Sequence, residues 1–257
     1  MSKNDSIGKT LLVAFALCIV CSVVVSTAAV MLKPAQEANK TLDRKRNILA
    51  AAGMLEEGAS IEAQFAQIQT RVVDLRSGRF TDAVDPASYE PVKAAKDPSR
   101  SMNLSQQEDI AGIGRREDYA LVYLVESASG DWDKVILPVR GYGLWSTLYG
   151  FIALESDANT VAGLGFYEHG ETPGLGGEVD NPRWKSQWPG KQVYRDGEVE
   201  IALAKGSVNA DSPDSRWRVD GLSGATLTSR GVTQLVQFWL GEQGYEPFLN
   251  NLKAGEA

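Results

Sequence analysis

Residues 119–125 read YALVYLV, a run of aliphatic, β-branched and aromatic residues that is typical of a buried strand. Short polar connectors such as Ser129-Gly130 and Asp157-Ala158-Asn159 favour antiparallel pairing of this run with its neighbours. Residues 229–243 then show an amphipathic helical pattern. The sequence therefore predicts an α+β domain with a mainly antiparallel sheet over residues 111–257. Further strand-like runs stand at 135–139, 148–154, 160–167, 199–204 and 217–219.

The N-terminal part of the chain contains a long apolar segment. Residues 11–32 read LLVAFALCIVCSVVVSTAAVML, with no charge, and as a helix they would extend about 33 Å, close to the roughly 30 Å hydrocarbon core of a bilayer. A signal peptide is the alternative, because Ser26–Ala29 weakly resembles a cleavage site. The apolar core of a signal peptide, however, spans only about 7–15 residues, which is shorter than this segment. We therefore expect a tail at residues 1–10, a single transmembrane helix at 11–32, and a helical stem with an irregular loop at 33–110.

The stem contains two apolar stripes with helical spacing, which predict helices up to about residue 77. Residues 80–107 show no periodicity and contain three prolines, so they predict a surface loop. The two stripes consist of Leu42, Ile48, Leu49, Met54 and Leu55, and of Ile61, Phe65, Ile68, Val72 and Leu75.

Composition excludes several classes of protein. The 257 residues carry 26 basic and 33 acidic side chains, and this acidic balance argues against a nucleic-acid partner. With one histidine and two cysteines, the chain cannot build a multi-histidine metal centre or a cysteine-rich cluster alone. Cys18 and Cys21 share one face of the predicted membrane helix. There they either pack against a neighbour or supply half of a shared metal or cluster site.

Residues 220–229 read DGLSGATLTS and end where the last predicted helix begins. Its glycines and alanine leave space for a ligand, and its hydroxyls gather at a helix N-terminus, where free N–H groups favour phosphate. An ordinary helix cap made by Thr228 or Ser229 would explain the same residues. The run has no Walker lysine and no dinucleotide-binding glycine pattern, so we expect no nucleoside-triphosphate chemistry.

Two more glycine-rich runs contain side chains suited to a flat ligand. Residues 169–177 read HGETPGLGG, in which Pro173-Gly174 predicts a turn and Glu171 and Thr172 could bond a heteroaromatic edge. Residues 141–145 read GYGLW and place two aromatic side chains in a turn. Ordinary glycine-rich hairpin loops remain the alternative for both runs.

Taken together, these runs resemble the FMN-binding domain of the C subunit of the Na⁺-translocating NADH:quinone oxidoreductase, the NQR complex. The pattern D-x-x-S-G-A-T at Asp220–Thr226 is similar to the covalent flavinylation motif that a bacterial flavin transferase recognises. ETPGLG at Glu171–Gly176 and GYG-x-W at Gly141–Trp145 also resemble this family. The resemblance covers essentially the whole chain, and the G subunit of the RNF complex, which shares the SGAT-type motif, is the alternative.

The resemblance implies that the phosphate of FMN is esterified to Thr226, with no catalytic side chain and no metal site in this chain. It also implies that His169 is a loop residue near the site and that Lys205 is a charge near the flavin or its phosphate. The other residues that it implies at the cofactor are Asp220, Ser223, Gly224, Ala225, Leu227, Thr228, Tyr142, Trp145, Glu171, Thr172, Leu175 and Gly176.

The resemblance further implies an electron carrier within a bacterial inner-membrane complex that oxidises NADH, reduces ubiquinone and exports Na⁺. Its partners would be the other NQR subunits and, during maturation, the flavin transferase. The FMN domain would lie on the periplasmic side. The Lys and Arg count around residues 11–32 favours the opposite orientation, because flanking positive charges favour the cytoplasmic side. A long domain after the helix weakens this charge rule.

Two other functions stay open from the residues alone. One is a non-catalytic, membrane-anchored binding or assembly module in which the SGAT run only caps a helix. The other is an anchored hydrolase that uses Ser223 or Thr226 with His169, although the chain contains no G-x-S-x-G elbow.

Overall fold

The computed structural model describes residues 6–56, 58–127 and 131–257. It divides into two compact units, Met1–Asp43 and Arg44–Ala257. The predicted connector Ser129-Gly130 lies outside the described residues.

The chain begins with one long helix, α1, which spans Ile7–Ala51 and contains Pro34. An 18-residue window of this helix has a mean hydropathy of 2.7, and none of it is buried. Length and composition therefore suit α1 to cross a membrane, as we predicted for residues 11–32. The helix runs on without a break past that segment, and only its last residues, among them Ile48 and Leu49, are buried.

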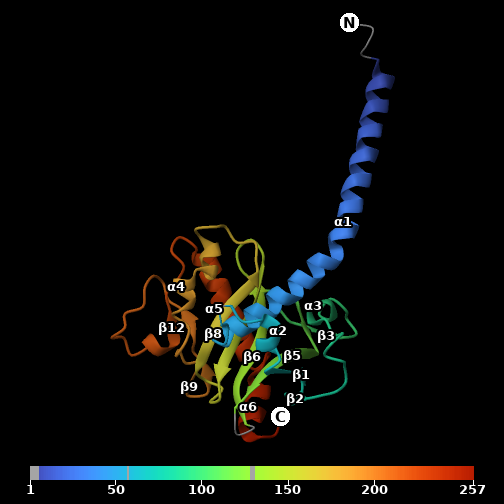
Figure 1. Ribbon diagram of the computed structural model, residues 1–257. Helices are drawn as coiled ribbons and strands as arrows, with labels where there is room; N and C mark the ends of the chain where they lie inside the picture. The colour runs from blue at the N-terminus through green and yellow to red at the C-terminus, as the bar shows by residue number, and fades with distance from the viewer. Residues whose placement is uncertain (1–5, 57, 128–130) are drawn as a thin grey trace. The chain divides into compact units, whose positions relative to one another are not determined.

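A six-stranded antiparallel sheet forms the centre of the second unit (Figure 1), which confirms the predicted α+β class. The strand order is β2-β1-β5-β6-β7-β8, and β6 and β7 pair over nine residues from Lys134↔Glu155 to Tyr142↔Thr147. The strands span β1 Ile68–Asp74, β2 Arg79–Phe80, β5 Tyr119–Glu126, β6 Trp132–Tyr142, β7 Thr147–Glu155 and β8 Val161–Glu168.

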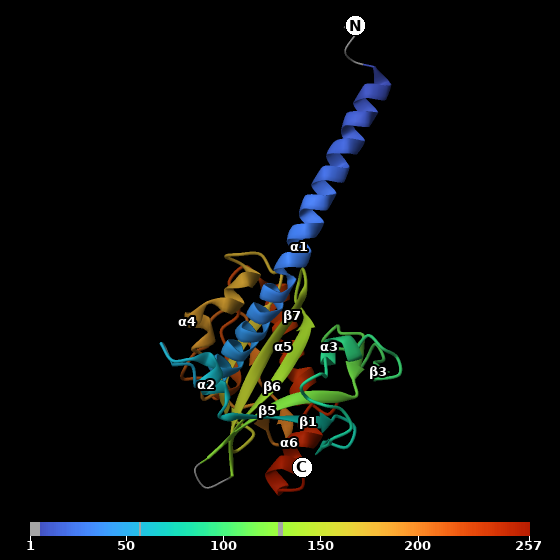
Figure 2. The ribbon, with the colours of Figure 1, turned by 45° about the vertical axis from the view of Figure 1, so that its right-hand side comes forward.

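Both faces of this sheet are covered, as Figure 2 shows. Because side chains alternate along a strand, Leu137 points to a core that includes Leu235 of helix α5 (Thr226–Leu240). Its neighbour Ile136 points to a second core that includes Ile48 and Leu49 at the end of α1. Strands buried on both faces lose the simple polar–apolar alternation.

Shorter elements surround the sheet. β3 pairs with β4 and β9 with β10, both antiparallel, whereas β11 and β12 pair in parallel. These elements are α2 Ile61–Phe65, α3 Pro91–Ala94, β3 Ser101–Asn103, β4 Arg115–Glu117, η1 Gly176–Asp180, α4 Pro182–Lys185, β9 Tyr194–Arg195, β10 Glu198–Val199, β11 Ala202–Leu203, η2 Ser215–Trp217, β12 Arg218–Val219 and α6 Glu246–Ala254.

The second helical stripe of the stem was the main error of the sequence prediction. Only Ile61–Phe65 is helical; Ile68–Asp74 is strand β1, which pairs with β5 along its whole length. Both Val72 and Val73 are buried because β1 has a core on each face. A short apolar run of this kind fits either period, and its pairing partner lies some fifty residues away.

The C-terminal helix also differs from the prediction. It begins at Thr226 and ends at Leu240, and the separate helix α6 follows. The predicted strand at 199–204 is likewise divided between β10 and β11. The earlier start of α5 places the whole SGAT run at its N-terminal end.

Candidate functional site

Helix α5 begins at Thr226, and Ala225 is its N-cap, with no side-chain hydrogen bond to the helix. The alternative of an ordinary cap made by Thr228 or Ser229 does not hold, since both residues follow the start of the helix. Gly224 has φ +70, a left-handed conformation that favours glycine. The Ser229 hydroxyl accepts a hydrogen bond from the Leu222 N–H at 2.9 Å, which closes the loop onto the helix. Thr226 itself is exposed.

The Glu171 carboxylate joins this helix start to the turn between β6 and β7. Its Oε1 accepts the backbone N–H groups of Leu144, Trp145 and Ser146 at 3.0, 2.9 and 3.3 Å. Its Oε2 accepts the hydroxyl of Thr228 at 2.7 Å. Glu171 is 5% exposed and Thr228 is fully buried. The carboxylate is thus held by four donors from two segments.

Glycines let the backbone approach this carboxylate closely. A Cβ at Gly143 would lie 2.5 Å from Glu171 Oε1, and a Cβ at Gly176 would lie 2.6 Å from both Glu171 Oε2 and Thr228 Oγ1. A Cβ at Gly224 would lie 3.0 Å from Leu175 Cδ2. The three glycine-rich runs of the sequence therefore meet at one place.

Helix α5 also packs directly on the end of strand β6. A Cβ at Gly231 would lie 2.5 Å from the Tyr142 carbonyl oxygen and 2.9 Å from Gly143 Cα. A Cβ at Gly141 would lie 2.7 Å from Leu235 Cβ. At Gly231 the helix meets the backbone of residues 142 and 143, and at Gly141 the Leu235 side chain lies against the strand, so a larger residue at either glycine would push helix and strand apart.

The pKa of the Glu171 carboxyl is lowered from its ordinary value of 4.5. Burial raises this pKa, but the hydrogen bonds from Thr228, Trp145, Leu144 and Ser146 together lower it by more. Hydrogen bonds to the charged form favour that form. The group is therefore ionised at neutral pH.

This shift predicts a pH dependence of stability. Because the folded pKa lies below the unfolded one, the contribution of Glu171 is full above about pH 4.5 and is lost as pH falls through the lowered folded value. We expect the difference in unfolding free energy between the parent chain and Glu171→Gln to stay constant from about pH 7 to 5 and to shrink in stronger acid. Urea unfolding at a series of pH values measures it, and a difference that grows on acidification would contradict the assignment.

A cationic pocket lies on another side of the α5 start. Its volume is about 370 Å³, and Thr226, Lys205 and Arg230 are among its lining residues. Arg230 follows Thr226 by one helical turn, so the two share a face of α5. The resemblance predicts Lys205 near the cofactor but does not indicate Arg230, whose four-residue spacing from Thr226 becomes informative only once the helix is known to begin at Thr226. The remaining lining residues are Leu203, Ala204, Gly206, Gly221, Leu222, Ser229 and Thr233.

Large apolar side chains are exposed on the converging loops and on the first turn of α5. Trp145 is 66% exposed and Leu227 is 52% exposed, and Tyr142 and Leu175 are also exposed. Water contact with this much apolar surface is unfavourable, and exposed apolar groups that gather near polar residues are typical of a ligand or partner site. A flat ring is a suitable cover for them.

Several predicted cofactor residues also make hydrogen bonds within the protein. Asp220 accepts the Val208 N–H on its side chain at 2.7 Å and the Trp184 indole N–H on its carbonyl at 2.9 Å. The Thr172 carbonyl accepts N–H groups from Leu175 and Gly177, which forms the turn, while its side chain is exposed. The hydroxyl of Thr228 is taken by Glu171. Ser223 and Gly224 are exposed beside Thr226.

His169 has partners at both ring nitrogens. Nε2 lies 2.8 Å from Asp180 Oδ2, and Nδ1 accepts the Glu171 N–H at 3.2 Å. Neither nitrogen is available to take a proton from Ser223 or Thr226 in this arrangement. The geometry therefore gives no support to a hydrolase that uses His169 as its base.

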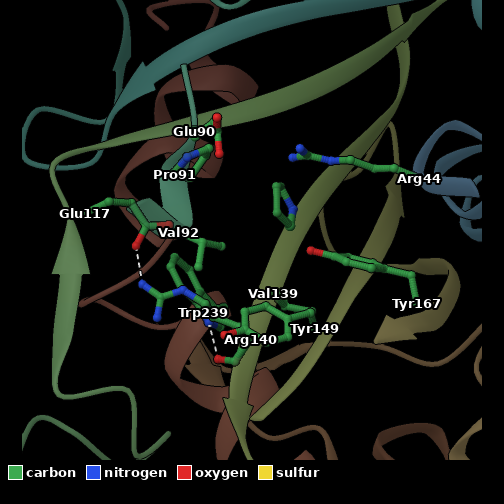
Figure 3. A pocket seen from close by; sticks show the side chains of 11 residues that line it. Arg44, Glu90, Pro91, Val92, Glu117, Val139, Arg140, Tyr149, Tyr167 and Trp239 are labelled. Atoms are coloured by element: carbon green, nitrogen blue, oxygen red, sulfur yellow. Dashed lines mark hydrogen bonds and ion pairs between the residues drawn. The ribbon is translucent and has the colours of Figure 1, made fainter. Parts of the chain in front are cut away.

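A separate cavity of about 100 Å³ lies against the strands β6, β7 and β8 (Figure 3). Arg44 and Tyr167 point into it from one side, and the buried ion pair of Arg140 with Glu117 lies on the other. Its lining residues include none of those predicted to contact FMN. This cavity is distinct from the site at the start of α5.

The residues at the start of α5 fit the chemistry of FMN. An exposed hydroxyl, two cationic side chains and the N–H groups of a first helical turn suit a phosphate. The exposed apolar side chains suit an aromatic ring. Gly224 and Gly176 let the side chains of Leu175, Glu171 and Thr228 pack directly against the backbone at this site.

Comparisons with known proteins agree with this site. Residues 143–241 match the family model described as an FMN-binding domain. The crystal structure of Shewanella oneidensis NqrC superposes with a TM-score of 0.77 at 37% identity, covering 84% of this chain and 99% of that one. A crystal structure of the corresponding NqrC-type subunit of the Na⁺-translocating NADH-quinone reductase from Parabacteroides distasonis gives a TM-score of 0.66 at 28% identity, covering 85% of this chain and 96% of that one.

Curated relatives match over nearly the entire length. The C subunit of the Na⁺-translocating NADH-quinone reductase of Pseudomonas aeruginosa is 57% identical over 100% of both chains. The C subunit of the Yersinia pestis reductase is 49% identical over 98% of this chain and 96% of that one. Identity at this level and coverage shows the family. The chain belongs to the family of C subunits of the Na⁺-translocating NADH-quinone reductases.

Proposed function

We propose that this chain is a covalently flavinylated electron carrier, with FMN bound as a phosphoester to Thr226. It passes electrons between other redox centres of a membrane complex that oxidises NADH, reduces ubiquinone and exports Na⁺. The observation that supports this most is the position of Thr226, which is exposed at the start of α5 and lines a pocket with Lys205 and Arg230. Family membership also favours the C subunit of NQR over the RNF alternative.

The protein's part at the phosphate is to hold and to orient it. A phosphodiester carries one negative charge, and Lys205 and Arg230, which line the same pocket as Thr226, supply two positive charges. The first N–H groups of α5 have no partner within the helix and lie at the positive end of its dipole. Together these groups fix the direction in which the attached flavin extends from Thr226.

Trp145, Leu175 and Leu227 are the side chains that would cover the ring, since they are apolar, exposed and close to the helix start. FMN supplies the electron-accepting and electron-donating ring, and the protein tunes it through contacts and nearby charges. The ester prevents the flavin from dissociating, so no binding equilibrium limits the carrier.

Attachment requires the flavin transferase as a transient partner. The Thr226 Oγ–phosphorus bond forms, the bond from that phosphorus to the donor's leaving group breaks, and the hydroxyl proton is lost. An activated FMN donor is needed, since the direct loss of water from FMN and threonine is unfavourable in water. We place the domain on the periplasmic side of the inner membrane, because a domain of this length translocates largely regardless of flanking charge.

A peptide map of the chain purified from its native membrane tests this proposal. We expect the intact mass to exceed the sequence mass by one FMN less one water, and the increment to lie on the peptide that contains Thr226. The increment must survive denaturation. An unmodified Thr226 peptide from active native complex would refute the proposal and would leave an anchored binding module as the remaining hypothesis.

A further inference from the structure

We propose that Glu171 is the positioning residue of the flavin site, whose carboxylate fixes the β6–β7 turn that carries Trp145 against the first turn of α5 that carries Thr226. This inference rests on the proposed attachment of FMN at Thr226. It replaces the predicted role of Glu171 as a direct contact of the flavin ring.

The hydrogen bonds of the carboxylate explain why it acts through other residues. Oε1 accepts three N–H groups from the turn, and Oε2 accepts the Thr228 hydroxyl. The side chain is 5% exposed, so little of it is open to a ligand. What this side chain controls is the position of the two segments that it joins.

The turn needs an anionic acceptor in order to keep its shape. Three consecutive N–H groups, of Leu144, Trp145 and Ser146, converge on one oxygen. Such a nest of N–H groups is an anion-binding concavity, and bonds to a charged acceptor are about twice as strong as neutral ones. Without the carboxylate these N–H groups would face one another without an acceptor, and the turn would open towards water.

The bond to Thr228 fixes the rotation of α5 about its axis. Successive residues of a helix are about 100° apart, so Thr228 and Thr226 point about 200° away from each other. When Thr228 is held inward by Glu171, Thr226 faces outward, as its exposure shows. One carboxylate thus determines where the attachment hydroxyl points and where the aromatic side chain stands.

The test compares three variants of the full-length chain, incubated with the flavin transferase and its flavin donor. Glu171→Met removes the acceptor and the charge, Glu171→Gln keeps an acceptor oxygen but no charge, and Thr228→Val removes one donor only. Glu168→Gln is the matched control, since Glu168 is an exposed glutamate three residues earlier in the chain. Rates of attachment come from intact mass, and unfolding temperatures are measured on each chain before attachment.

We expect attachment to slow at least about tenfold in Glu171→Met, which corresponds to roughly 1.4 kcal/mol, and to slow less in Glu171→Gln and Thr228→Val. Glu168→Gln should match the parent chain. A second readout is amide hydrogen exchange, where protection at residues 144–146 should fall selectively in Glu171→Met. If Glu171→Met does not fold, the attachment rates of Glu171→Gln, Thr228→Val and their double variant test the inference instead. Because the two side chains share one hydrogen bond, the slowing in the double variant should be less than the sum of the two single effects in free energy.

A purely structural role would lower the unfolding temperature without changing attachment below it, and that result would overturn the inference. Parent-like rates and parent-like exchange at residues 144–146 in Glu171→Met and Glu171→Gln would overturn it equally. The ratio of parent to Glu171→Gln rates should also fall in acid, as the parent carboxylate becomes protonated. A parent chain that never acquires flavin would instead refute the attachment at Thr226, and the exchange data would still report on the turn.

Discussion

Replacing Thr226 with alanine is expected to abolish covalent flavin entirely. The substitution removes the only atom to which the phosphoryl group is proposed to bond, so the chain should keep its sequence mass and should be colourless after denaturation. The fold should be unaffected, because Thr226 is exposed and lies at the first position of α5, where its hydroxyl is not the helix cap. Intact mass and in-gel flavin fluorescence measure the loss.

Two substitutions serve as controls for this prediction. Thr226→Ser keeps a hydroxyl at the same position and should retain attachment, with a slower rate from the more mobile side chain. Ser207→Ala removes an exposed hydroxyl outside the D-x-x-S-G-A-T motif and should leave the flavin in place. Covalent flavin on the Thr226→Ala chain would mean that another residue carries the ester.

The largest effect on stability is expected from Trp239→Ala. Trp239 is 1% exposed, its indole N–H donates to the Arg140 carbonyl at 2.7 Å, and its ring packs on Phe238 and Tyr245. Truncation of a buried aromatic side chain to alanine costs about 3–5 kcal/mol, because it removes apolar contacts and leaves a cavity. Loss of the indole donor adds roughly 1 kcal/mol or more at the buried carbonyl.

Trp145→Ala is the matched control, since it removes the same side chain from a site that is 66% exposed. Its unfolding free energy should stay within about 0.5 kcal/mol of the parent value, while the fluorescence of attached flavin should rise if the indole lies over the ring. Urea unfolding of the detergent-solubilised chain, followed by circular dichroism, measures both variants. Equal stabilities for the two variants would contradict the assigned core.

The sequence was sufficient for the long central strands from β5 to β8 and for the long apolar N-terminal helix. The runs at 119–125 and 148–154 lie within β5 and β7, because their aliphatic, β-branched and aromatic residues over so short a length favour strands. It was insufficient for Ile68–Asp74, where the apolar spacing fits a helix and a strand equally and only the distant partner β5 decides.

The candidate site was likewise predictable from the sequence only in part. The residue types and glycines of the three runs indicated ligand-binding loops, and the resemblance to the flavinylation motif indicated Thr226. The role of Glu171 was not visible, because its bond to Thr228 joins residues 57 positions apart. Arg230 was missed because a lone surface arginine carries no signal until the helix start is known.

The direct contact of α5 with strand β6 at Gly231 and Gly141 bears on the speed of electron transfer. Close packing at Gly231 and Gly141 leaves the start of α5, where we propose that FMN is attached, little freedom to move relative to the strand. For the proposed electron carrier, a rigid attachment point would keep small the structural rearrangement that accompanies each electron transfer. Bulkier residues at these two glycines would separate helix from sheet and make each electron hop slower even with the flavin fully in place.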